Sequence, residues 1–471
     1  MSTEVHAQID SERVRELTER EAKRLDEATP ESKRMFERAE EVMPLGVPSS
    51  YHARDPWPIY LERGEGPRVW DVDGRELWDF HNGFGSMVMG HAHPAIVEAI
   101  SERAKLGTHF AAPTEDGIVV AEELARRFRL PKWRFTNSGS EATMDAIRIA
   151  RGLKGRDTIV KIFGSYHGHH DGVMVAVGIS AVAINALGGW TELDPDEIPS
   201  FPYGGGVPQA VADLTVAVPF NDADALERRL HKLEQEGRKP ACLIMEPAMM
   251  NLGVVLPEPG YLEAVREITK QHDVLLIFDE VKTGLAIAAG GATERFGVQP
   301  DMVTLAKTLG AGLPSGAIGA TDEVMEVIED EKVFQVGTFN GNPLTMAAAR
   351  AGLLEVLTPE AYRRLDKIND RLIAGCQRVV DRYRLPAYTV GISSKGCVVF
   401  SDTKIVDYET FMTRQNVEVT ELAWLYNLNR GIFATPGREE EWTLSVTHTE
   451  EAADDYVAVF EKLARDLTGS D

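Results

Sequence analysis

The chain has 471 residues, 43% of them hydrophobic and 26% charged, which is ordinary for a globular protein of about two to four domains. Its net charge of −24 disfavours binding to nucleic acid or to an anionic membrane surface, because both are themselves negatively charged. The three cysteines form no metal-ligand pattern, the acidic N-terminus has no signal-peptide core, and no apolar run reaches membrane-spanning length. We therefore expect a cytoplasmic protein with reduced thiols.

The first predicted element is an amphipathic helical arm over residues 10–43, which ends before Pro44. Two short β-like stretches follow at residues 59–61 and 68–70, and a turn follows them at residues 71–74. We assign residues 1–75 to this N-terminal arm and to a segment of a smaller domain.

From about residue 94, strand-like and helix-like patterns alternate along the chain. The strands are apolar without polar alternation, which indicates a mostly parallel sheet buried on both faces and hence an α/β fold. The predicted strands lie at residues 134–137, 158–162, 241–246, 274–279, 302–306 and 317–320, and the predicted helices include residues 141–153, 223–236 and 261–272. Residues 178–219 are irregular and rich in Gly and Pro, which is typical of a functional or mobile loop.

The alternation of strands and helices ends in the C-terminal part of the chain. A long helix is predicted at residues 344–357, and strands near residues 396–400 and 442–446 belong to a helix-rich α+β section. We therefore expect a large domain over residues 76–340 and a smaller C-terminal domain over residues 341–471.

Four segments of the predicted large domain carry chemistry, and the first is a strand that ends in Ser138-Gly139-Ser140 and opens into a helix. Free backbone N–H groups, the helix dipole and small hydroxyl side chains together favour a phosphate group. An ordinary helix N-cap explains the same residues, because Ser and Gly are favoured there for structural reasons.

The second segment, residues 163–171, also follows a strand and contains Tyr166 and His167. An aromatic ring at the carboxyl end of a strand can stack on a flat heteroaromatic ring. The histidines invite a metal interpretation as well. However, His169 and His170 are adjacent and would point in different directions, so no metal site is predicted.

The third segment is the apolar run that ends in Asp279, Glu280 and Val281. A carboxylate at the end of such a run is costly to bury without a cationic partner. That partner could be Mg²⁺ or a protonated pyridine nitrogen, and the alternative is a capping or surface carboxylate. The chain has no G-x-x-x-x-G-K-[ST] motif, which excludes the P-loop nucleotide-binding class.

The fourth segment is an apolar strand that runs through Lys307 into the glycine-rich turn at residues 310–312. Burial shifts an ammonium group toward its neutral, nucleophilic form, whereas a lysine at an exposed strand end simply reaches into water. Phosphate site, stacking ring, carboxylate and amine together match one cofactor, pyridoxal 5′-phosphate, with each part at the carboxyl end of a predicted strand.

With these segments in view, the chain resembles the class III, fold type I aminotransferases, in the branch of glutamate-1-semialdehyde aminomutase and the β-amino-acid aminotransferases. The resemblance extends from about Pro44 to His448. It is carried by the segments at residues 70–74, 90–94, 137–142, 166–169, 246–247, 279–281, 310–314 and 337–343, and by Lys307. It implies a large domain with a mostly parallel central sheet flanked by helices, and a smaller α+β domain.

The resemblance also implies roles for individual residues. Lys307 would form the internal aldimine and move the proton, and Asp279 would pair with the pyridine nitrogen. Tyr166 and Val281 would cover the two faces of the ring, and Thr338 would reach the phosphate of a neighbouring subunit, giving a homodimer with shared active sites. The remaining cofactor-binding residues that it implies are Ser138, Gly139, Ser140, His167 and Glu246, the last as a support for other residues.

The substrate side departs from the family pattern. Related enzymes place a carboxylate-binding arginine after the first Pro-Gly-rich turn, and Ser49 stands at that place here. Arg54 and Arg438 are the candidate substitutes, each with a surface role as the alternative. The candidate pocket walls are Tyr51, Phe84 and Ser86, which core packing would explain equally well.

The leading functional prediction is amino transfer from an amine or amino acid, including β-amino acids and amines without a carboxylate, to a keto acid through pyridoxamine phosphate. The first alternative is an aminomutase of the glutamate-1-semialdehyde 2,1-aminomutase type. Lack of the aminomutase Phe-Glu-Ala-Gly-Phe pattern and the long segment at residues 178–219 favour the transferase. The second alternative is a non-catalytic module that binds pyridoxal phosphate, and the intact Lys307 and Asp279 argue against it.

Overall fold

The computed structural model describes residues 9–179, 181–438 and 441–470. The first eight residues of the predicted segment 1–75, and Glu439 and Glu440 beside the candidate Arg438, lie outside the described residues. No helix within the described part of the chain is both long enough and apolar enough to cross a membrane.

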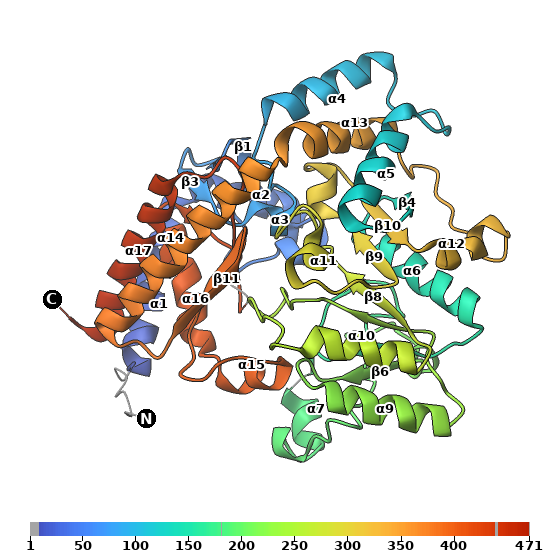
Figure 1. Cartoon of the computed structure of the whole chain (residues 1–471). Coiled ribbons are helices and arrows are strands. Elements are labelled where there is room, and N and C mark those ends of the chain that lie inside the picture. The colour runs from blue at the N-terminus through green and yellow to red at the C-terminus, as the bar shows by residue number, and fades with distance from the viewer. Residues whose placement is uncertain (1–8, 180, 439–440, 471) are drawn as a thin grey trace.

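A seven-stranded sheet forms the centre of the larger part of the molecule, at the right in Figure 1. Its strand order is β4-β10-β9-β8-β7-β5-β6, and only β10 runs antiparallel to its neighbours. The strands are β4 (Lys132–Thr136), β5 (Ile159–Ile162), β6 (Thr215–Val218), β7 (Cys242–Met245), β8 (Leu275–Asp279), β9 (Met302–Leu305) and β10 (Gly316–Ala320).

The apolar strands are buried because both faces of the sheet are covered. Along β8, Leu275 and Ile277 belong to one hydrophobic core, whereas Leu276 and Phe278 belong to another on the opposite face. Successive strand residues point to opposite faces, so a strand between two cores needs an apolar residue at every position. The predicted mostly parallel sheet buried on both faces is therefore confirmed.

Helices pack against the central sheet of the larger part. The helix α6 (Gly139–Lys154) contacts β4, β7, β8, β9 and β10, and α10 (Tyr261–Gln271) contacts β8. The other helices of this part are α3 (Asn82–Gly85), α4 (Pro94–Leu106), α5 (Glu115–Phe128), α7 (Ala181–Ala186), α8 (Gln209–Ala212), α9 (Ala223–Gln235), α11 (Gly291–Phe296), α12 (Asp322–Glu329) and α13 (Pro343–Ala351).

The smaller part, at the left in Figure 1, is built from both ends of the chain. One sheet has the order β1-β2-β3-β13, and another has the order β11-β12-β14. Strand β13 pairs in parallel with β3, so a C-terminal segment completes an N-terminal sheet. The strands are β1 (Leu61–Glu65), β2 (Arg68–Asp71), β3 (Glu76–Asp79), β11 (Tyr388–Ile392), β12 (Lys395–Val399), β13 (Ile432–Phe433) and β14 (Trp442–Thr443), and the helices are α1 (Ser11–Ala28), α2 (Pro30–Glu40), α14 (Pro359–Tyr383), α15 (Tyr408–Arg414), α16 (Val417–Leu428) and α17 (Glu450–Thr468).

The predicted helical arm at residues 10–43 consists of two helices, α1 and α2, with a break between them. The break lies at Thr29, which has non-helical dihedral angles and precedes Pro30 at the first position of α2. Proline suits the first turn of a helix but not its interior. The Thr29 hydroxyl donates to the carbonyl of Leu25 and accepts from the indole N–H of Trp57, which holds the corner in place.

The segment at residues 178–219 is also more ordered than its composition indicates. It contains α8 and the edge strand β6, which pairs in parallel with β5. Every residue of β6 is buried, but its four residues are too few to stand out beside the glycines and prolines before them.

Candidate active site

A cavity of about 750 Å³ lies where strands of the central sheet end. Part of its wall is formed by residues at or after the ends of β4, β5, β7, β8 and β9, which the sheet brings to one edge. The residues of its wall that the sequence predicted are Tyr51, Phe84, Ser86, Ser138, Gly139, Ser140, Tyr166, His167, Glu246, Asp279, Val281 and Lys307.

The first turn of α6 faces this cavity and presents unused donors. The Ser138 hydroxyl accepts from the amide of Glu141 at 3.1 Å, so Ser138 is the N-cap of α6. The alternative interpretation of these residues as an ordinary helix cap is therefore correct for Ser138. The amides of Gly139 and Ser140 have no hydrogen-bond partner among the described residues. Donors at the start of a 16-residue helix suit an anion, so the cap and the phosphate site are compatible.

Glycine is required at position 139 by the opposite wall. A Cβ atom there would lie 2.9 Å from Cγ2 of Val281 and 3.1 Å from its Cγ1. Any side chain at position 139 would therefore press against Val281.

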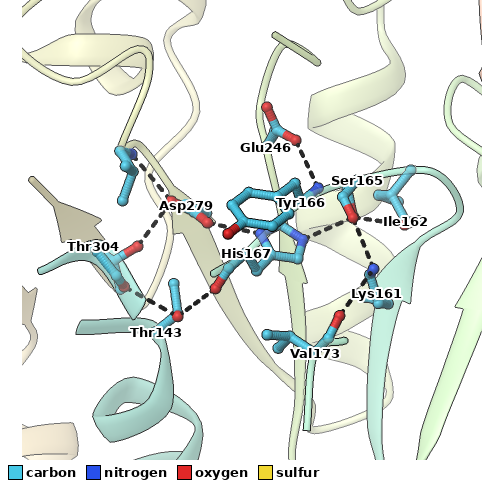
Figure 2. A network of polar contacts seen from close by, with 12 residues as sticks. Thr143, Lys161, Ile162, Ser165, Tyr166, His167, Val173, Glu246, Asp279 and Thr304 are labelled. Atoms are coloured by element: carbon cyan, nitrogen blue, oxygen red, sulfur yellow. Dashed lines mark hydrogen bonds and ion pairs between the residues drawn. The ribbon is translucent and has the colours of Figure 1, made fainter. Parts of the chain in front are cut away.

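Asp279 is held in one orientation by three donors and is almost fully buried. Its Oδ1 accepts from the amide of Val281 at 3.0 Å and from the hydroxyl of Thr304 at 3.2 Å. Its Oδ2 lies 2.7 Å from Nδ1 of His167, whose Nε2 lies 2.8 Å from the hydroxyl of Ser165 (Figure 2). These donors thus hold the carboxylate at the end of β8 in a fixed direction, away from water.

Behind this contact lies a buried lysine, Lys161, which the sequence prediction missed. Its ammonium group donates to the carbonyl of Ser165 at 2.8 Å and lies 3.5 Å from that of Val173 (Figure 2). It also donates to the carbonyl of Val175 at 2.7 Å. Burial lowers the pKa of Lys161 to about 7. Lys161 therefore ties the loop that carries Tyr166 and His167 to strand β5.

Tyr166 and Glu246 form another part of the wall. The Glu246 carboxylate accepts from the amide of Tyr166 at 3.2 Å, from the amide of Met250 at 2.9 Å and from the side chain of Asn251 at 2.9 Å. Burial raises the pKa of both Glu246 and Tyr166. Glu246 joins two loops of the wall, and Tyr51 contacts Tyr166 edge to face, with ring centroids 5.9 Å apart.

Lys307 is separated from the end of β9 by Ala306 alone and adopts a backbone conformation that lysine rarely takes. Its φ is 45°, in the left-handed region, which costs about 1–3 kcal/mol for a non-glycine residue and is concentrated at functional sites. Its Nζ lies 5.6 Å from the ring centroid of Phe84, and it makes no hydrogen bond or ion pair with the described residues. Burial, followed by the nearby ammonium groups of Lys282 and Lys395, lowers the pKa of Lys307 to about 8.

These residues fit pyridoxal 5′-phosphate. One side of the cavity offers unpaired helix amides for a phosphate, and Asp279 offers an oriented carboxylate for a ring nitrogen. Lys307 offers an amine that is neutral in a large fraction of molecules near pH 8.

The remaining predicted site residues lie elsewhere. Thr338 is exposed and lies outside the cavity of its own chain. Arg54 donates to the carbonyl of Ala53, and Arg438 lies over the ring of Phe411, 4.8 Å from its centroid. Neither arginine lines the cavity, so the geometry of this chain does not support their predicted contact with a substrate.

A buried charge cluster beside the cavity was not predicted from the sequence. Lys282 lies in the cavity wall, and its Nζ lies 2.7 Å from Oε1 of Glu441 and 2.5 Å from the carbonyl of Met250. Lys395 lies 3.5 Å from the same Glu441 oxygen. The only sequence signal is a lysine shortly after Asp279 in an otherwise apolar stretch, and its pairing with Glu441 depends on the fold.

Comparison with known proteins identifies the same chemistry. Residues 50–407 match the family model described as aminotransferase class-III. A glutamate-1-semialdehyde 2,1-aminomutase 2 of Brevibacillus brevis is 39% identical over 89% of this chain and 95% of its own length. A glutamate-1-semialdehyde 2,1-aminomutase of Methanocaldococcus jannaschii is 36% identical over 93% of this chain and 98% of its own.

Two solved structures extend the comparison. A glutamate-1-semialdehyde-aminomutase from Pseudomonas aeruginosa superposes with a TM-score of 0.87, at 30% identity, over 98% of this chain and 99% of its own. An omega-transaminase from Sphaerobacter thermophilus superposes with a TM-score of 0.84, at 33% identity, over 93% of this chain and 97% of its own.

Proposed function

The chain belongs to the class III aminotransferase family, and on that basis we propose that it moves an amino group from an amine or amino acid to a keto acid at the cavity around Lys307. It is a fold type I enzyme that depends on pyridoxal 5′-phosphate. The observation that supports the proposed site most strongly is that Lys307 and the oriented carboxylate of Asp279 face one cavity from the ends of adjacent strands.

When bound, the cofactor accepts the electron pair released as a proton leaves the donor carbon. Lys307 would hold the cofactor covalently through Nζ, and its amine, once released, would take that proton and return it. A pKa of about 8 suits a group that must accept and then donate a proton near neutral pH. Phe84, whose ring lies beside this amine, helps to exclude water from it.

The other residues of the wall position the ring. Asp279 would pair with the ring nitrogen, and the contact with His167 fixes the direction of its carboxylate. Tyr166 and Val281 would cover the ring. The amides of Gly139 and Ser140, with their neighbour Ser138, would bind the phosphate.

The homodimer with shared active sites remains part of this proposal. Thr338 lies in a segment whose Phe334, Val336 and Phe339 are 68%, 79% and 57% exposed. Several large apolar side chains exposed in one short segment are typical of a surface that another chain covers. We propose that a second copy of the chain covers this segment. Thr338 would then reach the phosphate bound in that second copy.

An aminomutase is the second candidate, because relatives with that name are 36–39% identical to the chain. The two reactions differ in one requirement. A transferase needs a keto acid to regain its starting form, whereas a mutase returns the amino group to the same molecule.

A donor panel with and without pyruvate or 2-oxoglutarate tests the proposal. The panel contains 1-phenylethylamine, a β-amino acid and several α-amino acids, with loss of the visible absorbance of the bound cofactor as the readout. Sustained turnover only with added keto acid supports transfer. Rapid conversion of glutamate-1-semialdehyde without any keto acid supports the mutase, and activity on α-amino acids alone contradicts the wider donor range.

A further inference from the structure

Two histidines and a glutamate meet where two neighbouring helices of the larger part pack together, and these three residues are here called the α9–α10 cluster. Glu227 and His231 lie about one turn apart on α9, and His272 directly follows α10. The two helices contact each other and lie side by side at the bottom of Figure 1. One ligand atom of each residue, a ring nitrogen or a carboxylate oxygen, lies within 4.8 Å of the other two.

Packing holds the histidine at the end of α10 in place. The His272 side chain is 7% exposed, and the backbone amide of His272 donates to the carbonyl of Ile268 at 3.0 Å. The ring of His272 meets that of His231 edge to face, with centroids 4.5 Å apart and an angle of 79° between the ring planes. Oε2 of Glu234 lies 3.6 Å from Nδ1 of His272, while the other Glu234 oxygen accepts from Lys239 at 2.7 Å.

The cluster offers the ligands that zinc prefers in proteins. Zn²⁺ binds imidazole nitrogens and carboxylate oxygens in a tetrahedral arrangement, whereas Mg²⁺ and Ca²⁺ take oxygen ligands. Zinc–ligand bonds of about 2.0–2.2 Å place neighbouring ligand atoms roughly 3.4 Å apart, so the three atoms need to close by no more than about 1.4 Å. His231 is exposed and Glu227 is half-buried, so both side chains can rotate toward the buried His272.

Two further features of the helices suit a metal ion. Because Glu227 and His231 are four residues apart, they lie on the same face of α9, which is the face toward His272. Zinc-ligating histidines usually have a carboxylate beside their other ring nitrogen. Glu234, beside Nδ1 of His272, offers such a partner when Nε2 faces the ion.

The α9–α10 cluster is separate from the cavity around Lys307. His272 lies just before the start of β8, whereas Asp279 ends that strand, so the cluster lies toward the opposite edge of the sheet. None of the three cluster residues is part of the cavity wall. An ion bound here would therefore act on the packing of α9 against α10.

We propose that Glu227, His231 and His272 bind one Zn²⁺ ion, which joins α9 to α10. The ion takes one nitrogen from each histidine and an oxygen from the glutamate, and a water molecule completes the tetrahedron. Because the ligands come from two helices, the ion binds the folded chain more tightly than the unfolded chain and stabilises the fold. This site is additional to the proposed amino transfer and does not depend on it.

Zinc binding is measured on the tag-free holoenzyme after metal ions have been removed with a chelator. Isothermal titration with ZnCl₂ should give one ion per chain with a dissociation constant on the order of 1 μM or below. Zinc at roughly a hundredfold of that concentration should raise Tm by about 2 °C or more. MgCl₂ at the same concentration should leave Tm unchanged, because magnesium requires oxygen ligands.

Variants of the cluster identify the ligands. His231→Ala and His272→Ala should each weaken zinc binding by about a hundredfold or more and abolish the rise in Tm, and Glu227→Gln should weaken binding by about tenfold. Glu236→Gln is the matched control, because it removes a carboxylate at the end of α9 outside the cluster, and it should bind zinc like the wild type. His231 is exposed, so His231→Ala tests the site even if the buried His272 cannot be replaced without loss of folding.

Loss of zinc binding in His231→Ala, with retention in Glu236→Gln, supports the inference. Wild-type protein that binds no zinc overturns it. Zinc binding of equal affinity in His231→Ala and wild type also overturns it, because the ion would then be held elsewhere on the protein.

Discussion

Nδ1 of His167 and Oδ2 of Asp279 are 2.7 Å apart, and the other nitrogen of the same ring is held by Ser165. The His167 ring therefore connects the loop after β5 to the Asp279 carboxylate at the end of β8 and holds that carboxylate in place. Because Asp279 is nearly fully buried, its orientation depends on this contact more than on solvent.

Replacing His167 should therefore weaken retention of the cofactor, because the Asp279 carboxylate loses the partner that orients it. In His167→Phe, Asp279 loses a buried partner, and a hydrogen bond to a charged group contributes about 1.5–3 kcal/mol. We expect the dissociation constant for pyridoxal 5′-phosphate to rise roughly tenfold to a hundredfold. Ser165→Ala is the control and should have a smaller effect, because it leaves the ring in place. Equal affinity in His167→Phe and wild type would contradict this role.

A methyl group at position 139 should disturb the cofactor site through Val281. In Gly139→Ala the new Cβ meets Cγ2 of Val281 at 2.9 Å, and overpacking of this kind costs about 1–3 kcal/mol. We expect cofactor affinity to fall roughly tenfold or more, measured by fluorescence quenching on titration. The double variant Gly139→Ala/Val281→Ala should recover part of that loss. No recovery would mean that the methyl group blocks the phosphate itself.

The pKa of Lys307 predicts how cofactor uptake depends on pH. The value is lowered from 10.5 to about 8, so the fraction of neutral amine rises as pH approaches 8 and changes little above it. Only a neutral amine attacks an aldehyde, so the rate at which cofactor-free protein takes up pyridoxal 5′-phosphate should rise about tenfold per unit below pH 8 and then level off. Pyridoxine 5′-phosphate lacks the aldehyde, and its binding should not follow this curve. A rise that continues to pH 10 would indicate an ordinary lysine.

Shared active sites can be tested with mixed dimers. Thr338→Glu places a negative charge where the proposal places the partner's phosphate, so this homodimer should bind cofactor poorly. A Lys307→Ala homodimer should be inactive. In a hybrid of the two chains, one site carries both changes and the other carries neither, so each hybrid should recover about half of wild-type activity. Absence of any recovery in purified hybrids would contradict the assignment of Thr338.

The central sheet could be predicted from sequence because burial on both faces makes its strands continuously apolar. The predicted strand at residues 274–279 and the observed β8 differ by one residue at the start. Strand β6 could not be predicted, because its four residues follow a Gly- and Pro-rich stretch. The corner at Thr29 was missed because apolar positions at helical spacing continue on both sides of it.

The candidate site likewise has one part that could be predicted from the sequence and one part that could not. Residues that follow strands on one side of a parallel sheet must meet, so a sequence pattern suffices to bring Asp279 and Lys307 together. Lys282 and Glu441 lie far apart in the chain and on different elements, and no local pattern joins them. The left-handed backbone of Lys307 is also a product of the turn that surrounds it.

The most direct test of the account is the visible absorption spectrum of purified Lys307→Ala beside that of the wild-type protein. The account predicts that Lys307→Ala folds but loses both the visible band of the covalently held cofactor and amino transfer, whereas the wild-type protein shows both. Unchanged turnover in Lys307→Ala would contradict the assignment of Lys307 as the reactive amine.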